Sequence, residues 1–137
     1  MSFDYSEFRR LRNNFARLTS EFNSWIYAFL LREGEHFIRV VKRRTPVDTG
    51  DLRSHWAIQG ITRQGDNLQV EIVNPMHYAS FVEYGHAKPY KAGASPGSAD
   101  WVDGYFMMTV SVQTVIKQMP ARFRKEFDVF LASLEVK

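Results

Sequence analysis

Large apolar residues recur at steps of three and four along the first third of the chain. These steps place the residues on one helical face, because an α-helix has 3.6 residues per turn. The stripe consists of Phe8, Leu11, Phe15, Leu18, Phe22, Trp25 and Phe29. Asp4–Glu7 has the pattern of a capping box, which opens a helix, and Pro46 predicts an end near Arg44. We therefore predict an N-terminal helical region over residues 1–44, either continuous or broken at Thr19–Ser20.

The middle of the chain carries the pattern of a β-hairpin. His55–Thr62 and Leu68–Val73 are predicted as two strands, and in the second Leu68, Val70 and Ile72 alternate with Gln69 and Glu71, as in a half-buried strand. The connection Gln64–Asn67 contains glycine, aspartate and asparagine, which favour a tight turn. Asn74-Pro75 ends the second strand.

A short helix and a long loop are predicted after the hairpin. The helix covers Tyr78–Tyr84, with Gly85 as its C-terminal cap and with Phe81 and Val82 buried. Residues 86–101 follow as a loop rich in glycine, alanine and serine.

The last part of the chain combines a strand pattern with a helical one. A third strand is predicted over Val102–Ser111, where one set of residues alternates with another: Val102, Gly104, Phe106, Met108 and Val110 with Tyr105, Met107, Thr109 and Ser111. Ser111 can cap a short helix, and Pro120 suits the first turn of the last helix. The apolar face of that helix consists of Phe123, Phe127, Phe130, Leu131 and Leu134.

These elements predict a single domain of the α+β class. A small antiparallel β-sheet within residues 45–111 packs with the long N-terminal helix and with a C-terminal helical region over 112–137. There are no internal repeats and no composition shift that would mark a second domain.

Between the first helical region and the hairpin lies a corner in which most residues restrict the backbone. Asp48 and Thr49 favour a turn, and Gly50 can adopt a conformation forbidden to residues with a Cβ atom. Leu52 and Trp56 supply apolar contacts that would hold the corner against a core. We interpret the corner as a helix-to-strand connection; an active-site loop is the alternative, since Asp48 and Asp51 lie close together. The residues assigned to this structural corner are Pro46, Asp48, Gly50, Leu52 and Trp56.

Three blocks of the sequence match the pattern of a known family, in the right order. They are Thr45–Arg53 followed by Trp56; Asn74-Pro75 with Tyr78-Ala79 and Val82–His86; and Gly104–Ser111. The first two blocks resemble the HK97 gp10-like family of tailed-phage proteins. The third is similar to the branch of that family found in contractile, myovirus-type particles and defective prophages.

The resemblance implies a structural virion protein that has no catalytic residues and no cofactor. Members of the family are described as tail-completion or neck components between the portal-adaptor stack and the tail. The resemblance implies a ring, six-membered to match the tail, that contacts neighbouring neck, connector, tail-terminator or tail-tube proteins. A tail-terminator subunit that caps the tube and a DNA-binding adaptor in the connector are the alternatives. The implied location is the virion, after assembly in the cytoplasm of the bacterial host.

The chain of 137 residues is rich in aromatic side chains, with 11 Phe, 6 Tyr and 3 Trp. Tyr and Trp are enriched at protein interfaces. The N-terminal helix is also longer than one small sheet can cover, so we expect part of it to pack against a neighbouring chain. The absence of cysteine excludes disulfides and thiolate metal sites. The longest apolar run, Trp25–Leu31, is too short to cross a bilayer, and the first residues lack the pattern of a signal peptide.

The sequence contains no recognised catalytic or metal-binding pattern. None of the four histidines forms an i, i+4 pair with a carboxylate nearby, as a helical zinc site would require; they are His36, His55, His77 and His86. Asp51, Ser54 and His55 look like a triad in the sequence, but neighbouring residues on an extended strand point to opposite faces. We therefore expect a protein that is not an enzyme and that binds no metal or cofactor.

Two groups of residues are candidates for contacts with partners. The first is a basic cluster that could bind DNA phosphates, or could complement a helix dipole or meet another subunit; it consists of Arg39, Lys42, Arg43, Arg44 and Arg53. The second is an assembly arm in the 86–101 loop, which is long for a compact domain. Its candidate subunit contacts are Tyr84, His86, Lys88, Tyr90 and Lys91.

Overall fold

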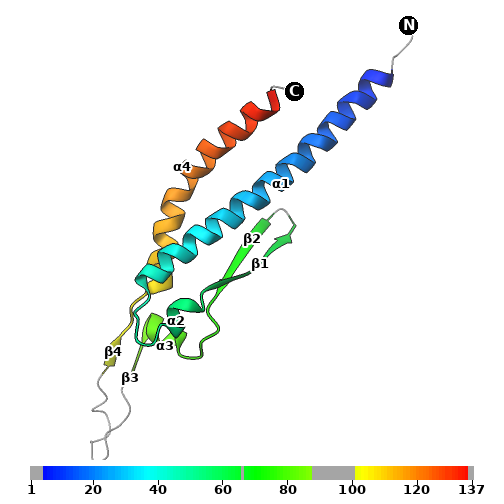
Figure 1. The fold of residues 1–137 in the computed structure, drawn as a ribbon. Coiled ribbons are helices and arrows are strands. Elements are labelled where there is room, and N and C mark those ends of the chain that lie inside the picture. Colours follow the sequence, from blue (N-terminus) through cyan, green and yellow to red (C-terminus); the bar gives the residue numbers. More distant parts are fainter. Residues whose placement is uncertain (1–4, 66, 88–100, 136–137) are drawn as a thin grey trace, which may run out of the picture.

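The computed structural model describes residues 5–65, 67–87 and 101–135 (Figure 1). Helix α1 runs from Tyr5 to Arg44 as one helix of 40 residues, about 60 Å long at 1.5 Å per residue. The alternative of a break at Thr19–Ser20 is therefore wrong. The Thr19 hydroxyl donates to the carbonyl of Phe15 at 2.9 Å, so it bonds within the helix and does not cap a new one.

The predicted hairpin is confirmed, with small shifts at the strand ends. Strand β1 (Ala57–Gln64) pairs antiparallel with β2 (Asn67–Val73). Helix α1 packs closely on this hairpin at Gly34, where an added Cβ would lie 3.1 Å from side-chain carbons of Ile58 and Val70. A glycine at this position lets the helix and the sheet approach each other.

A second, separate pair of strands follows the hairpin. Helix α3 (Ala79–Tyr84) matches the predicted short helix and leads directly into β3 (Gly85–Ala87). Strand β3 pairs antiparallel with β4 (Trp101–Asp103). The prediction that all of residues 86–101 form a loop is therefore corrected at both ends, which pair with each other.

Helix α4 (Met107–Glu135) begins earlier than expected. The third strand predicted over 102–111 is wrong beyond Asp103, and so is the prediction that Ser111 caps a helix. Ser111 is fully buried inside α4, and its hydroxyl donates to the Met107 carbonyl one turn earlier. The alternation of apolar and polar residues favoured a strand, whereas the buried positions Met107, Ser111 and Val115 are spaced as on a helix.

Helix α1 is the central rod of the molecule, with α4 along one side and the β1–β2 hairpin along the other (Figure 1). The N-terminal part of α1 extends beyond both. The prediction that Pro120 begins the last helix is wrong, because Pro120 lies inside α4. There it removes one backbone N–H donor from the interior of the helix. The predicted α+β class is confirmed, with a long N-terminal helix, two small antiparallel sheets and a C-terminal helix.

The buried core lies around the C-terminal half of α1. It consists of Phe37, Val40, Val41, Leu52, Trp56, Met107 and Val115. Nearer the N-terminus, aromatic rings join α1 to α4: Trp25 stacks on Phe130 with centroids 5.2 Å apart, and Phe22 meets Phe127 edge-on at 6.2 Å. Such pairs stabilise a fold by about 0.5–1.5 kcal/mol each beyond their burial. The later part of the aromatic stripe therefore packs within the chain.

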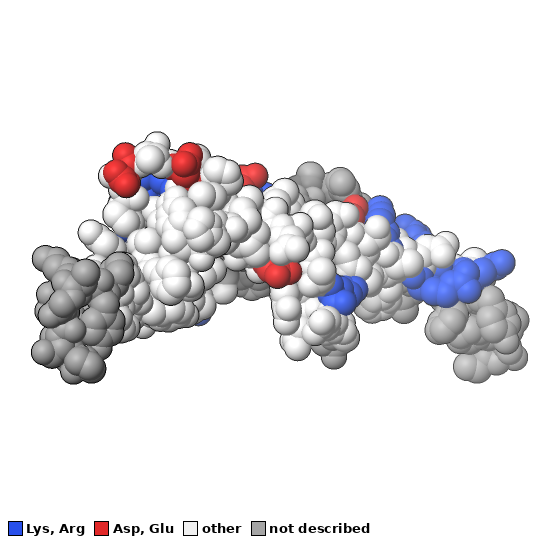
Figure 2. All heavy atoms as spheres, turned by 90° about the horizontal axis from the view of Figure 1, so that it is seen from below, with Lys and Arg blue, Asp and Glu red and all other residues white. Residues whose placement is uncertain are grey.

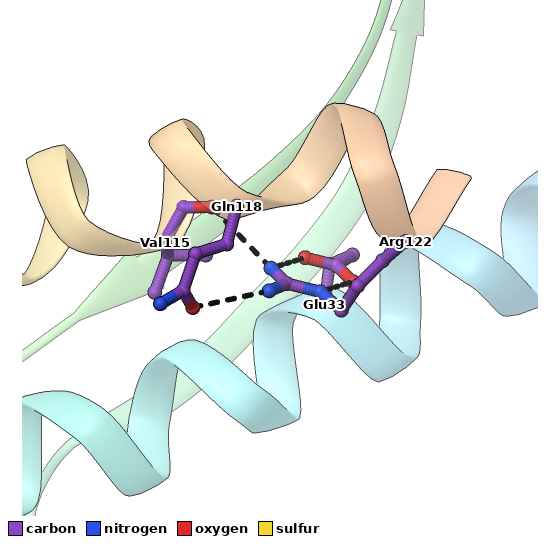
Figure 3. Close-up of polar contacts among 4 residues, drawn as sticks. All are labelled: Glu33, Val115, Gln118 and Arg122. Atoms are coloured by element: carbon purple, nitrogen blue, oxygen red, sulfur yellow. Dashed lines mark hydrogen bonds and ion pairs between the residues drawn. The ribbon is translucent and has the colours of Figure 1, made fainter. Parts of the chain in front are cut away.

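A largely buried ion pair also joins α1 to α4 (Figure 3). Arg122 donates through Nε and Nη2 to the two carboxylate oxygens of Glu33, at 2.8 and 2.6 Å. The Glu33 side chain is 8% exposed and that of Arg122 is 29% exposed. The hydrogen bond to Glu33 raises the pKa of Arg122 above its usual value. The remaining donors of Arg122 reach Gln118 Oε1 and the Val115 carbonyl, both at 3.3 Å.

His36 is affected by burial and by this ion pair. Burial lowers the pKa of His36 below 6.5, and the positive charge of Arg122 lowers it further, more than Glu33 raises it. Arg39 and Arg43 act in the same direction as Arg122. Within the described part of the chain, His36 Nε2 is buried without a hydrogen-bond partner. The neutral imidazole is therefore the form that suits the folded protein.

Removing the carboxylate of Glu33 should leave Arg122 without its partner. We expect Glu33→Leu to lower the free energy of unfolding by about 3 kcal/mol, measured by urea denaturation, because a buried charge then loses its compensation. The double variant Glu33→Leu/Arg122→Met should recover most of this loss. The exposed pair Arg32–Glu126 at 2.9 Å is the control, and Glu126→Gln should cost no more than about 1 kcal/mol. A double variant no more stable than the single one would contradict this account.

Acid should destabilise the protein through His36. The unfolded chain takes up a proton near pH 6.5 and the folded protein only at lower pH, so the His36 contribution is present above pH 6.5 and lost below it. We expect the melting temperature to fall between pH 7.5 and pH 5.5, and to fall less in His36→Phe. An identical fall in both proteins would show that His36 does not cause it.

Candidate assembly surfaces

The corner between α1 and β1 is held by the hydroxyl group of Thr45. This hydroxyl donates to the Val41 carbonyl at 2.7 Å and accepts a hydrogen bond from the Trp56 indole N–H at 2.9 Å. Arg53 Nη2 donates to the Thr45 carbonyl at 2.9 Å. Thr45, Leu52 and Trp56 are all buried. The end of α1 and the start of β1 are therefore tied together.

Helix α2 (Asp51–Ser54) forms the turn of the corner. Gly50 precedes it with φ of 88°, a left-handed conformation that disfavours any residue with a Cβ. The Thr49 hydroxyl accepts a hydrogen bond from the Asp51 N–H at 3.3 Å. Asp48 is exposed, and no hydrogen bond involves its carboxylate within the described residues. Thr49 thus supplies the turn contact, and the carboxylate of Asp48 faces solvent.

The prediction that Ser54 and His55 diverge is wrong, because both lie at the end of α2 and not on a strand. Ser54 Oγ lies 3.2 Å from His55 Nδ1, and the same nitrogen lies 2.6 Å from the Asp51 main-chain carbonyl. A catalytic triad orients its imidazole with a carboxylate, whereas Asp51 contributes its backbone here. In the described ranges, no three His, Asp or Glu residues are grouped so as to hold a metal ion.

The N-terminus of α4 is held by the buried carboxylate of Glu83 on α3. Glu83 accepts hydrogen bonds from the N–H groups of Met108 and Thr109 at 2.8 and 2.9 Å, and from the Thr109 hydroxyl at 2.6 Å. The first N–H groups of a helix lack partners inside it and carry partial positive charge. The inward face of α3 therefore carries Glu83, and the prediction that Phe81 is buried is wrong: it is 54% exposed.

The base of the β3–β4 pair is fixed to α3 by close backbone contact. The N–H of Tyr105 donates to the Val82 carbonyl at 2.8 Å, and the N–H of Phe106 to that of Glu83 at 3.0 Å. A Cβ on Gly104 would lie 2.3 Å from the Glu83 carbonyl oxygen. Because Gly104 has no side chain, its backbone can touch the backbone of residues 83–85.

Exposed aromatic side chains surround this base. They are Tyr84, Trp101, Tyr105 and Phe106, each between 45% and 64% exposed. Tyr84 and Phe106 meet edge-on with centroids 6.5 Å apart. Exposed aromatic residues grouped on a small domain are typical of an interaction surface.

A groove lies beside this base, between the corner and α3. Residues 46–52 line one side, and Tyr78, Val82 and Tyr105 line the other. Its volume is about 580 Å³. Asp48 and Asp51 are exposed along it, so it combines apolar walls with two carboxylates. We call it the corner groove.

The predicted partner contacts fall in different places. Tyr84 belongs to the aromatic group and His86 follows it on β3, whereas Lys88, Tyr90 and Lys91 lie outside the described residues. Arg39, Arg43 and Arg44 are exposed on the last turns of α1, Lys42 is half-buried, and Arg53 bonds to the Thr45 carbonyl. None of these basic residues lines the corner groove.

The N-terminal part of α1 forms a second exposed surface. Phe15 is 61% exposed and Leu18 is 36% exposed. Four exposed arginines lie on the same segment: Arg9, Arg10, Arg12 and Arg17. No carboxylate within the described part of the chain forms an ion pair with any of them. We call residues 9–18 the helix tip; on the face drawn in Figure 2, basic side chains gather at this end, and acidic side chains are spread over the rest of the molecule.

These features define an elongated α+β protein. Each of its two ends carries an exposed surface on which apolar and charged side chains occur together. The family model described as "Bacteriophage HK97-gp10, putative tail-component" matches residues 9–85, more than half of the chain. The chain belongs to this family of phage tail components. The matched segment includes the helix tip, the corner, the hairpin and α3. No curated protein and no solved structure was found to match the chain.

The family match bears on two predictions made from the sequence. The family is confirmed, whereas the similarity of Gly104–Ser111 to the contractile-particle branch lies outside the matched residues and stays a prediction. No helix in the described ranges is long and apolar enough to span a membrane.

Sequence reasoning missed three of the groups that build these surfaces. Trp56, the partner of Thr45, is 11 residues away, and Met108, a partner of Glu83, is 25 residues away, so no local pattern reveals either contact. The helix tip did carry a signal, because four of the nine residues in Arg9–Arg17 are arginine.

Removing the Glu83 carboxylate should loosen the attachment of α4. We expect Glu83→Ala to cost about 1–3 kcal/mol of unfolding free energy in urea denaturation, because buried helix N–H groups lose their acceptor. Glu83→Gln should cost less, since its amide oxygen can still accept. Glu35→Ala, at an exposed position of α1, is the control and should change stability by less than about 0.5 kcal/mol. A stable Glu83→Ala variant would contradict this role.

Proposed function

We propose that this chain is a structural subunit of the neck of a tailed phage or a phage-tail-like particle. Copies of the chain form a ring that completes the tail or joins it to the head. Membership of the tail-component family, matched over residues 9–85, carries the proposal. Assembly takes place in the host cytoplasm, before the finished particle is released.

Exposed apolar groups at both ends of the molecule support self-assembly. Phe15 at the helix tip and Tyr105 at the corner groove are both more than 60% exposed. Burying apolar surface stabilises an assembly by roughly 25 cal/mol per Å². Surfaces at opposite ends of a rod lead to head-to-tail contacts, which close into a ring when the rotation between copies allows it. Six copies would match the tail, as the resemblance implies.

We propose that the role is not enzymatic. In the described ranges, the Ser54–His55 pair meets a main-chain carbonyl and not a carboxylate. Among the described residues, the lining of the corner groove includes two aspartates but no histidine or lysine. This supports a groove that binds a partner.

A DNA-binding adaptor is the second candidate. Arg39, Arg43 and Arg44 are exposed together at the end of α1, and exposed arginines can bind phosphates. Phosphate binding weakens steeply with salt, so DNA retention that disappears by about 0.2 M salt would favour this candidate.

Native mass spectrometry of the purified protein and electron microscopy of purified particles test the proposal together. We expect oligomers, or assembly once neck proteins are added, and a ring located between head and tail. A strictly monomeric protein that is absent from particles would refute the proposal. A ring located at the top of the tail tube, without contact to the connector, would identify a tail terminator instead.

A further inference from the structure

We infer that the helix tip of one copy docks into the corner groove of a second copy, with tip arginines opposite Asp48 and Asp51. The inference rests on the proposed function, because it names the contact through which the subunits assemble. The occupant of the groove is thus a segment of this same chain.

The corner groove has the chemistry to receive a basic, apolar helix. Tyr78, Val82 and Tyr105 provide apolar contact on one side, and Asp48 and Asp51 provide negative charge on the other. The Asp48 carboxylate has no hydrogen-bond partner within the described residues. Tyr105 also belongs to the exposed aromatic group, so the groove is continuous with a larger apolar surface.

The helix tip has the complementary chemistry. Phe15 and Leu18 are apolar and exposed, and the arginines at 9, 10, 12 and 17 are exposed without an ion pair in the described part of the chain. Guanidinium groups form strong, directed hydrogen bonds with carboxylates. Figure 2 shows basic side chains gathered at the end of the molecule that carries the helix tip.

The tip and the groove of one chain cannot meet. Helix α1 is continuous, and about 40 Å of it separates Leu18 from the corner at 1.5 Å per residue. The contact must therefore form between two copies, and it joins different surfaces on each. Such heterologous contacts lead to rings or open filaments, which agrees with the ring proposed above.

DNA is a less suitable occupant for these surfaces. At the helix tip, DNA phosphates would bind the arginines but would leave Phe15 and Leu18 exposed. At the corner groove, Asp48 and Asp51 would repel them. A second copy satisfies the apolar and the charged groups together. A stable contact buries roughly 800 Å² per partner; the tip spans only about 15 Å of helix, so the neighbouring aromatic group must contribute.

A charge-swap experiment tests this contact. The groove variant is Asp48→Arg/Asp51→Arg, and the tip variant is Arg12→Glu/Arg17→Glu. Each alone brings like charges together, and we expect its self-association to weaken by about tenfold or more in analytical ultracentrifugation at low salt. In an equimolar mixture every junction again pairs opposite charges, so assembly should return with the two variants in a 1:1 ratio.

Controls separate the contact from folding and from general charge effects. Lys117→Glu and Asp128→Arg change exposed charges on α4, outside both surfaces, and should assemble like the unaltered protein. All variants should keep the melting temperature of the unaltered protein within a few degrees.

Three outcomes would overturn the inference. They are variants that assemble normally alone, a mixture that fails to recover, and a tip variant that loses DNA binding while its self-association is unchanged. If the unaltered protein assembles but the charge-swap variants do not behave as expected, alone or mixed, only this contact is refuted. If the unaltered protein neither assembles nor enters particles, the proposed function fails as well.

Discussion

The hydroxyl of Thr45 is the contact on which the rest of the structure depends. It closes the end of α1 by donating to Val41 and holds the start of the hairpin by accepting from Trp56. A buried indole N–H without an acceptor would cost about 1–3 kcal/mol, so the two elements keep one fixed angle. The corner groove is built on this junction, because Pro46 to Leu52 line one of its sides.

Glu83 makes a similar connection on the other side of the groove. By accepting from the first N–H groups of α4, it joins α3, the β3–β4 pair and the C-terminal helix into one unit. The core, the ion pair of Glu33 with Arg122 and the aromatic rings then hold α4 along α1 as far as Phe22. Residues 12–20 of α1 lie beyond these contacts and are all exposed. A surface that one copy leaves uncovered is available to the next.

Local patterns predicted the elements whose determinants lie close together in sequence. The end of α1 follows from Pro46, the hairpin from its alternation and turn residues, and α3 from its glycine cap. The prediction of a third strand failed because residues 102–110 alternate like a strand, while Glu83 accepts a hydrogen bond from the N–H of Met108, 25 residues later, and stabilises a helix start at Met107. The corner was located from its motif, and of its two predicted turn formers, Asp48 and Thr49, it is Thr49 that makes the turn contact. The length of the helix predicts that part of α1 packs against a neighbouring chain, but the pattern alone does not locate the helix tip, because it does not show where α4 stops covering α1.

Disulfide cross-linking between copies tests the central claim most directly, because the chain contains no cysteine of its own. Phe15→Cys places a thiol on the helix tip, and Val47→Cys places one at the corner groove, where the side chain is 55% exposed. A disulfide requires Cα atoms within about 7 Å, which these two positions in one chain cannot reach along a rod of this length. When the two single variants are mixed and oxidised, our account predicts a covalent pair joining residue 15 of one copy to residue 47 of another. If assembly occurs and only 15–15 or 47–47 pairs form, the head-to-tail account is contradicted.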